Sequence, residues 1–356
     1  MSTAGRIFSS PQPAVHVNVR VLPRARIDRQ YGRCSPEVEA MKQPESYLGW
    51  KIDFRNPPGE PSSLDPDSMH WKIYKNPVAM AVGGVAAVLL EFADARIRSG
   101  VWDHSIYRQD PIGRSKRTGV AAMVGVYGPK RAAERVVQGV TNMHARVSGT
   151  TPKGEAYRAL DVELLDWVIA TAAYGFLTAY DTFVERVPES DKSRYYAEAA
   201  PGAMLYGVQH SPMSTADFFD MMNRLIHRFE PHPINEEFLA IIQSGRAAPG
   251  TPKYLSRAMG RASVSLLPRI VRDKLGLGPK YDLSAIDRVA VKALGRFLER
   301  TPIPGSPPCD ASLRVGLPAN FLFAGRRRQT ELMAAWRAAG LGMKQPAVTT
   351  LVQPAE

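Results

Sequence analysis

Cysteine is scarce in this chain, and its scarcity excludes several kinds of protein. Only Cys34 and Cys309 occur among 356 residues, which is too few for a disulfide framework. No C-x-x-C-H motif is present, so covalent attachment of a c-type haem is excluded. Two isolated cysteines are compatible with a thiol-reducing cytoplasm, and a bridge between them stays open at this point.

Targeting signals and long apolar runs are also missing. The N-terminus has neither the apolar core of a signal peptide nor a twin-arginine motif. The longest uncharged apolar run, residues 78–90, is shorter than the roughly 20 residues that cross a bilayer. We therefore expect a cytoplasmic protein without a transmembrane segment.

Motifs for several large enzyme classes are absent. There is no G-x-G-x-x-G, no phosphate loop G-x-x-x-x-G-K-[ST], no H-E-x-x-H and no G-x-S-x-G. Only residues 15–21 alternate like a strand or an extended arm. The remaining periodicity is helical, so the sequence predicts an all-α protein with a single large domain. We expect an irregular N-terminal arm over 1–69, a helical domain over 70–300, and a C-terminal tail over 301–356 with one helix.

Acidic residues are fewer than basic ones, and the net charge is +12. Such an excess of positive charge suggests nucleic acid or an anionic membrane as a binding partner. The cations are scattered, however, and the only dense run, Arg326–Arg328, has no interleaved aromatic residues. We expect no nucleic-acid binding. A non-enzymatic helical binding protein with a basic surface stays open as an alternative.

Residues 110–147 have the pattern of a helical hairpin. Asp110 can cap the first helix, with Pro111 at its first position, where a missing N–H costs nothing. Gly128 can end that helix in a left-handed turn, and Pro129 can start the next helix. The pattern predicts two helices that pack antiparallel.

One histidine lies on the apolar face of the second helix. His144 follows Val136 and Val140 at successive spacings of four, and Val147 continues the row after three. An imidazole on such a row is either buried in the core or bound to something.

The first helix presents a cationic, hydroxyl-bearing face. Arg114 and Thr118 are four residues apart and share one side of that helix. At about 1.5 Å rise per residue, Arg114 and His144 reach nearly the same level in an antiparallel hairpin. A planar, apolar cofactor with an iron centre and anionic edges suits the space between them.

These residues carry a family resemblance. The chain is similar to the haem b oxygenase family that contains the latex-clearing proteins (rubber oxygenases) and the mycophenolic-acid biosynthesis oxygenase B, over roughly residues 75–299. The similar segments are D-H-S followed by D-P-I-G-R-S-K-R-T within 103–118, M-H-A-R-V-S-G at 143–149, and A-L-D-V-E-L-L-D-W-V at 159–168.

The resemblance implies a globin-like helical core around a haem b pocket. It implies that His144 is the axial iron ligand and that Arg114 and Thr118 lie at the haem pocket. Arg117 matches a lysine near the pocket mouth in the rubber oxygenases. His104 is a further candidate for cofactor contact, with a structural hydrogen-bonding role as the alternative.

The resemblance also implies a reaction with O₂ on a small apolar substrate, a terpenoid or polyprenyl-like alkene, with cleavage of the double bond. The family's distal glutamate is not matched, since the register gives Arg98 there. Asp94 or Asp103 then becomes the candidate base, or the enzyme hydroxylates instead. A haem peroxygenase or peroxidase is the other enzymatic alternative, and the oligomeric state stays open.

Overall fold

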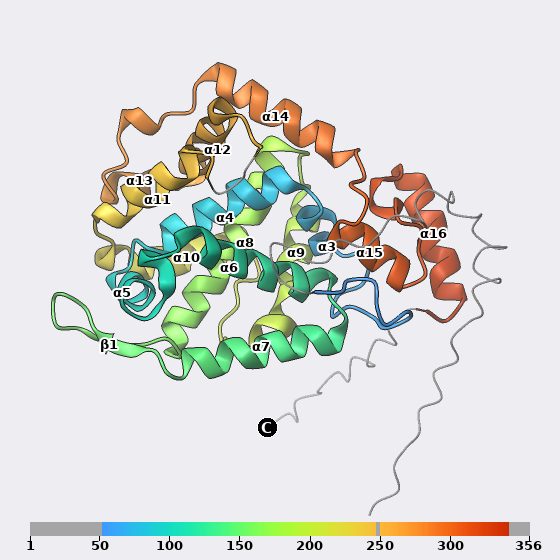
Figure 1. Ribbon diagram of the computed structural model, residues 1–356, viewed down its shortest axis with the longest axis horizontal. Coiled ribbons are helices and arrows are strands. Elements are labelled where there is room, and N and C mark those ends of the chain that lie inside the picture. Colours follow the sequence, from blue (N-terminus) through green and yellow to red (C-terminus); the bar gives the residue numbers. More distant parts are fainter. Residues whose placement is uncertain (1–51, 247–249, 342–356) are drawn as a thin grey trace, which may run out of the picture. The chain divides into compact units, whose positions relative to one another are not determined.

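The helices begin where capping side chains allow it. The computed structural model describes residues 52–246 and 250–341 (Figure 1). Asn76 caps α4 (Pro77–Glu91) by accepting hydrogen bonds from the N–H groups of Val78 and Ala79. Asp110 caps α6 (Pro111–Tyr127) in the same way, through the N–H of Gly113. Both caps satisfy donors that a helix leaves free at its start, as the sequence predicted.

The all-α prediction is confirmed for the described residues. Apart from short 3₁₀ turns, the regular structure is α-helix with one two-stranded antiparallel hairpin. The predicted strand at 15–21 lies outside the described residues. The other elements are α3 (Met69–Tyr74), α5 (Ala95–His104), α7 (Lys130–His144), β1 (Ser148–Thr150), β2 (Ala156–Arg158), α8 (Val162–Phe183), α9 (Glu189–Met204), α10 (Thr215–Leu225), α11 (Pro233–Gln243), α12 (Lys253–Leu266), α13 (Arg269–Lys274), α14 (Ala285–Glu299), α15 (Pro307–Arg314) and α16 (Arg326–Ala338).

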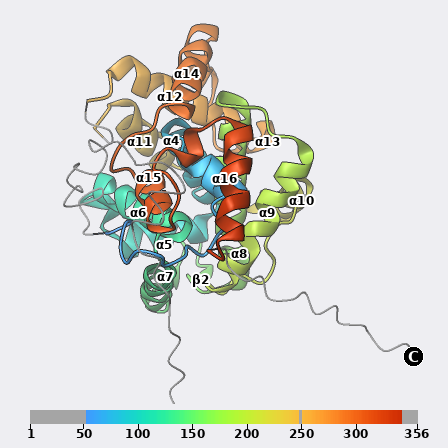
Figure 2. The same cartoon turned by 90° about the vertical axis from the view of Figure 1, so that its right-hand side faces the viewer.

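The core is built around the packing of α4 against α8, which lie together in the middle of Figures 1 and 2. Two glycines let the helix backbones touch. A Cβ on Gly83 would lie 2.7 Å from the carbonyl oxygen of Gly175, and a Cβ on Gly175 would lie 2.5 Å from that of Gly83. Trp167 is fully buried nearby and donates its indole N–H to the carbonyl of Leu90, which makes it a core residue.

α8 is also the one described helix that is long and apolar enough to cross a bilayer, which the sequence analysis did not anticipate. Of its most apolar 18-residue window, 67% is buried within the protein. That burial is what a central core helix requires.

The stretch from residue 77 to residue 99 forms parts of two helices and not one continuous helix. α4 ends at Glu91, and α5 starts after Asp94. The Asp94 carboxylate accepts a hydrogen bond from the N–H of Arg96 and also pairs with the Arg96 guanidinium at 2.7 Å. This buried cap provides a new helix start, so the chain turns here.

The hairpin of α6 and α7 forms as predicted, but the predicted left-handed turn at Gly128 is wrong. Gly128 is extended, with φ −64° and ψ 157°. Glycine is needed there for another reason, because a Cβ would lie 2.5 Å from the carbonyl oxygen of Val124. Pro129 then precedes the first residue of α7.

The C-terminal part is fastened to the core by two buried cations. Lys75 pairs with Glu299 at 2.8 Å and donates to the carbonyl of Leu322. Arg314, 2% exposed, donates to the carbonyls of Glu60 and Tyr127. Arg314 belongs to α15, a helix that the sequence analysis did not assign. Its two leading prolines fit the first turn of a helix, where N–H groups are free in any case.

Candidate active site

The apolar row of α7 is only partly covered by protein. Ala133 is the buried residue of this helix, while Val136, Val140 and His144 keep partial exposure. An apolar row that faced a packed core would be buried. The row is therefore partly open at the surface of the described residues, and the His144 ring lies at its end.

Arg114 and Thr118 share one side of α6, as their spacing predicted. The Arg114 guanidinium lies 3.5 Å from the Thr118 hydroxyl, which itself donates to the Arg114 carbonyl at 3.3 Å. Arg114 is partly buried, whereas Thr118 and Arg117 are exposed. Arg117 acts on Arg114 electrostatically, since its charge helps to lower the pKa of that guanidinium.

Arg114 also brings together residues from three helices. Burial, followed by the charge of Arg114, lowers the pKa of His144 on α7. The same cation opposes the effect of burial on Glu91, at the end of α4. Arg114 thus lies within electrostatic range of both His144 and Glu91. We call Glu91, Arg114, Thr118, His144 and the hydroxyl of Thr171 the Arg114 site.

Glu91 is the acidic member of this site. Burial raises its pKa to about 7, although the nearby Arg114 cation and a hydrogen bond from Thr171 at 3.5 Å act to lower it. Glu91 continues a row of α4 with Gly84 and Val88, at spacings of four and three, and all three side-chain positions keep partial exposure. A carboxyl group with a pKa near neutrality can both take up and release a proton under ordinary conditions.

Glycines leave further room on the hairpin helices. Neither Gly125 on α6 nor Gly139 on α7 would bring a Cβ within 4 Å of another group. Across the described residues, no three His, Cys, Asp or Glu side chains are grouped to hold a metal ion directly. His144 can therefore supply a single protein ligand to a cofactor that carries its own metal.

The other candidates from the sequence lie elsewhere. His104 is exposed at the end of α5, with its ring edge-on to Tyr157 at 6.2 Å, so the described contacts do not join it to Arg114. Arg98 pairs with Glu230 at 2.6 Å. Asp94 caps α5, and Asp103 is exposed, so neither occupies the position of a base beside Arg114.

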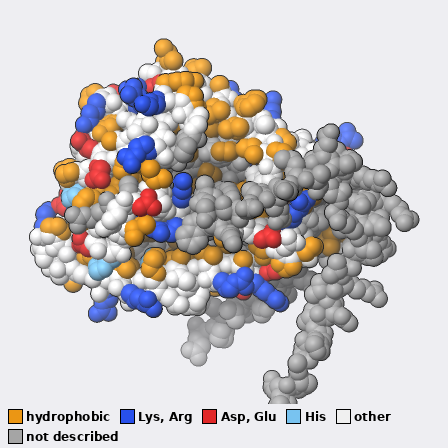
Figure 3. Space-filling model, in the orientation of Figure 1, with side chains coloured by type: hydrophobic (Ala, Val, Ile, Leu, Met, Phe, Trp, Pro, Cys, Tyr) orange, Lys and Arg blue, Asp and Glu red, His pale blue; other side chains and the backbone are white. Residues whose placement is uncertain are grey.

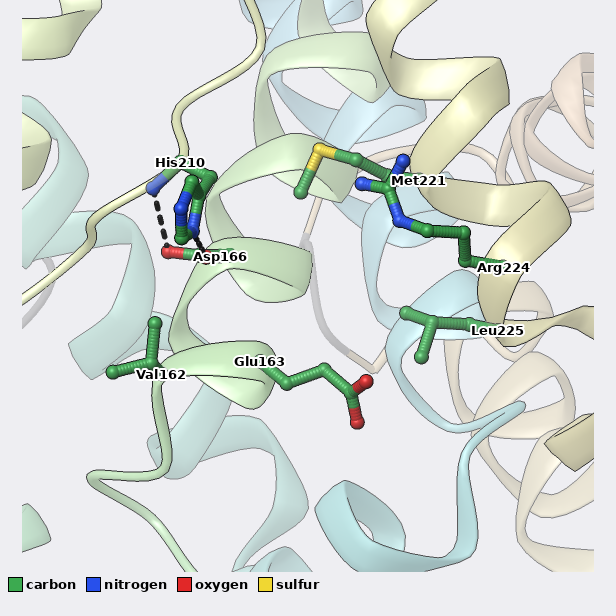
Figure 4. A pocket seen from close by; sticks show the side chains of 7 residues that line it. All are labelled: Val162, Glu163, Asp166, His210, Met221, Arg224 and Leu225. Carbon is green, nitrogen blue, oxygen red and sulfur yellow. Dashed lines mark hydrogen bonds and ion pairs between the residues drawn. The ribbon is translucent and has the colours of Figure 1, made fainter.

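A separate hollow of about 360 Å³ lies between the start of α8 and α10 (Figure 4). Its Asp166 carboxylate accepts from His210 Nδ1 at 2.9 Å and from the N–H of Gln209 at 2.8 Å. These bonds fasten the loop before α10 to α8. The lining has no Ser or Cys to act as a nucleophile with this pair; it consists of Val162, Glu163, Asp166, His210, Met221, Arg224 and Leu225.

Comparison with known proteins agrees with this arrangement. Residues 71–300, about two thirds of the chain, match the family described as ER-bound oxygenase mpaB/B′/Rubber oxygenase, catalytic domain. The chain belongs to this oxygenase family. Searches of curated proteins and of solved structures find no match to the chain. The predicted family is therefore confirmed, and an oxygenase is the class of enzyme that it supports.

Glu91 is the residue of the site that sequence reasoning missed. Counting back along the chain from Arg114 leads to Arg98, which lies on α5 and pairs with Glu230. The break at 92–94 turns α5 away, and the acid beside Arg114 comes from α4 instead. One signal was available: Glu91 is the only charged residue of an otherwise uncharged helix, 77–91.

Proposed function

We propose that the chain is a haem b-dependent oxygenase that uses O₂ to oxidise a small apolar alkene of terpenoid type. The observation that carries this proposal is that the charge of Arg114 acts on His144 and on Glu91, which belong to two other helices. Membership of an oxygenase family supports the reaction class. The cofactor and the substrate are the parts of the proposal that experiments have to test.

The residues present fit a haem. His144 would hold the iron through one ring nitrogen, and its lowered pKa keeps the imidazole neutral, which is the form that binds metal. The partly exposed row of Val136 and Val140 offers an apolar wall for a flat ring. Arg114 is a guanidinium of the kind that pairs with a carboxylate edge. Haem, when bound, would supply the activation of O₂.

The chain's own groups would control protons and water around the substrate. Above pH 7 the Glu91 carboxylate can accept a proton at Oε, and the Thr171 hydroxyl, which donates to the carbonyl of Val168 at 2.8 Å, lies 3.5 Å from it. Arg114 stabilises negative charge that develops beside it, which is most effective where water is excluded. Val88 and Gly84, next to Glu91 on α4, leave an apolar surface for an alkene.

Cleavage of the double bond balances without a reductant. One alkene and one O₂ give two carbonyl products, so the C=C bond is lost and each carbon gains one oxygen atom. Hydroxylation would instead need two electrons and two protons from a donor. Oxygen uptake with squalene as probe, in the presence and absence of a reductant, therefore separates the two reactions.

A peroxygenase is the second candidate, favoured by the action of the Arg114 charge on Glu91. A carboxyl group that exchanges protons near pH 7, beside a cation, also suits heterolysis of H₂O₂. Catalase added to the assay would stop such an enzyme and leave an O₂-dependent one unaffected. Product formation that survives catalase and disappears under nitrogen supports the oxygenase.

Substitution of Glu91 tests its role as the proton acceptor. We expect Glu91→Gln to bind haem normally and to lower turnover by about 100-fold, the usual scale for loss of a general base. In the parent protein, turnover should rise as pH rises through about 7, because the ionised carboxylate is the active form. The measurement is the pH profile of O₂ uptake with the probe alkene.

The matched control for Glu91 is Glu236→Gln, which removes an exposed carboxylate that pairs with Lys280. It should leave both the rate and the profile unchanged. A Glu91→Gln protein that keeps the parent rate and the inflection near pH 7 would remove Glu91 from the mechanism while leaving the haem proposal intact.

A further inference from the structure

Helix α14 presents an apolar row to the outside of the protein. Ile286 is 81% exposed, Val289 67% and Phe297 64%, and Ala293 between them is also exposed. Spacings of three, four and four place these four residues on one face. The opposite side holds α14 in the fold through buried Val291 and Gly295, the latter close to the carbonyl oxygen of Phe183.

The acids and the cations of α14 differ in whether they have partners within the fold. Both acids of the helix form ion pairs with other parts of the fold. Asp287 pairs with Arg261 of α12 at 3.0 Å, and Glu299 pairs with buried Lys75 at 2.8 Å. Its cations form no ion pair with any described residue. Arg288 and Arg296 are exposed, Lys292 is partly exposed, and the exposed Arg300 follows the last residue of the helix.

The surface next to α14 also combines exposed apolar and basic side chains. α12 packs beside it in both ribbon views, and the start of α12 carries Tyr254, 68% exposed, between Lys253 and Arg257. Figure 3 shows hydrophobic side chains gathered on the surface over α12 and α14. Single exposed apolar residues are ordinary on protein surfaces, whereas a row of this size within a group of cations marks an interaction site.

We propose that the α14 face docks onto the surface of an anionic phospholipid membrane. A helix that lies in such a surface buries large apolar side chains among the acyl chains and keeps Lys and Arg at the level of the headgroups. The row Ile286, Val289 and Phe297 supplies the first requirement. The cations of the helix, which pair with no described residue, supply the second, because an anionic leaflet attracts Lys and Arg.

Two other occupants fit this face less well. A second copy docked through a two-fold axis would bring the same unpaired cations together, which is repulsive. Nucleic acid would engage Arg288 and Arg296, but it would leave the exposed Ile286 and Phe297 in water. A membrane is the partner that satisfies both parts of the surface. The proposal is independent of the Arg114 site.

Binding to vesicles tests the proposal with the full-length chain. We expect the protein to float with vesicles that contain phosphatidylglycerol and phosphatidylcholine, and to stay behind with phosphatidylcholine alone. Removing two cations in Arg288→Gln/Arg296→Gln should weaken binding by about tenfold or more at low salt. Removing apolar area in Ile286→Ser/Phe297→Ser should abolish the binding that remains at high salt, since salt screens the charges.

Controls locate the effect on α14. Met204→Ser removes a residue that is 63% exposed on α9, and it should bind vesicles like the parent. In Phe297→Trp, indole emission should shift to the blue on addition of the anionic vesicles. Equal binding by all variants, no shift at residue 297, or a dimer that dissociates in Phe297→Ser would overturn the proposal. So would binding to duplex DNA that vesicles do not displace.

Discussion

Replacing His144 with alanine is expected to abolish the Soret band of the purified protein and all oxygenase turnover. Among the described histidines, His144 is the one whose pKa the charge of Arg114 lowers, and without its ring the row on α7 would offer a haem no axial ligand. The absorption spectrum after reconstitution with haem is the measurement, with circular dichroism to show that the helices are retained. Because α7 buries only Ala133 strongly, loss of the ring should leave the fold intact.

Two controls and a rescue make this result specific. His104→Ala and His210→Ala remove exposed rings at other places, on α5 and beside Asp166, and both should keep the band. Millimolar imidazole should restore absorption to His144→Gly by filling the vacated position. A Soret band that survives His144→Ala unchanged would reject His144 as the ligand, and with it the proposed arrangement of the site.

Replacing Gly83 with alanine should strongly destabilise the protein. The added Cβ would lie 2.7 Å from the carbonyl oxygen of Gly175 and 2.8 Å from Cα of Phe176, and both are backbone atoms that cannot rotate away. Overpacking of this kind costs roughly 1–3 kcal/mol or more. For a chain of this size we expect a fall in Tm on the order of 5–10 °C, measured by thermal denaturation.

The adjacent Gly84 provides the control for this prediction. A Cβ there would meet only the ring of Phe176, at an ordinary 3.6 Å. Gly84→Ala should therefore keep Tm or raise it, since alanine favours a helix over glycine by about 1 kcal/mol. If both alanine variants lower Tm equally, close approach of the two helices is not the reason for the glycine at 83.

The two glycines show how far sequence reasoning reached. Two adjacent glycines within a helix permit close approach to the backbone, either by another helix or by a cofactor. Only the packed structure decides between them, and it assigns Gly83 to the contact with α8. Gly84 instead lies on the partly exposed row that leads to Glu91. Neighbouring residues on a helix differ by about 100°, so identical residues can serve different purposes.

What the sequence determined by itself was local or carried by the family pattern. Caps at Asn76 and Asp110, the hairpin of α6 and α7, and the shared face of Arg114 and Thr118 depend on residues a few positions apart. Such relations follow from helix geometry alone and survive any later packing. The all-α class and the oxygenase family followed from the same segments.

The tertiary structure decided which groups from different helices meet. Glu91 is 23 positions before Arg114 in the chain, and no periodicity links them. They come together because α4 stops at Glu91 and the next helix starts in a new direction at a buried cap, Asp94. The angle between two helices depends on how all their side chains pack, which a single sequence does not display. For the same reason, only the packed fold shows that one amphipathic helix, α14, turns part of its apolar surface outward.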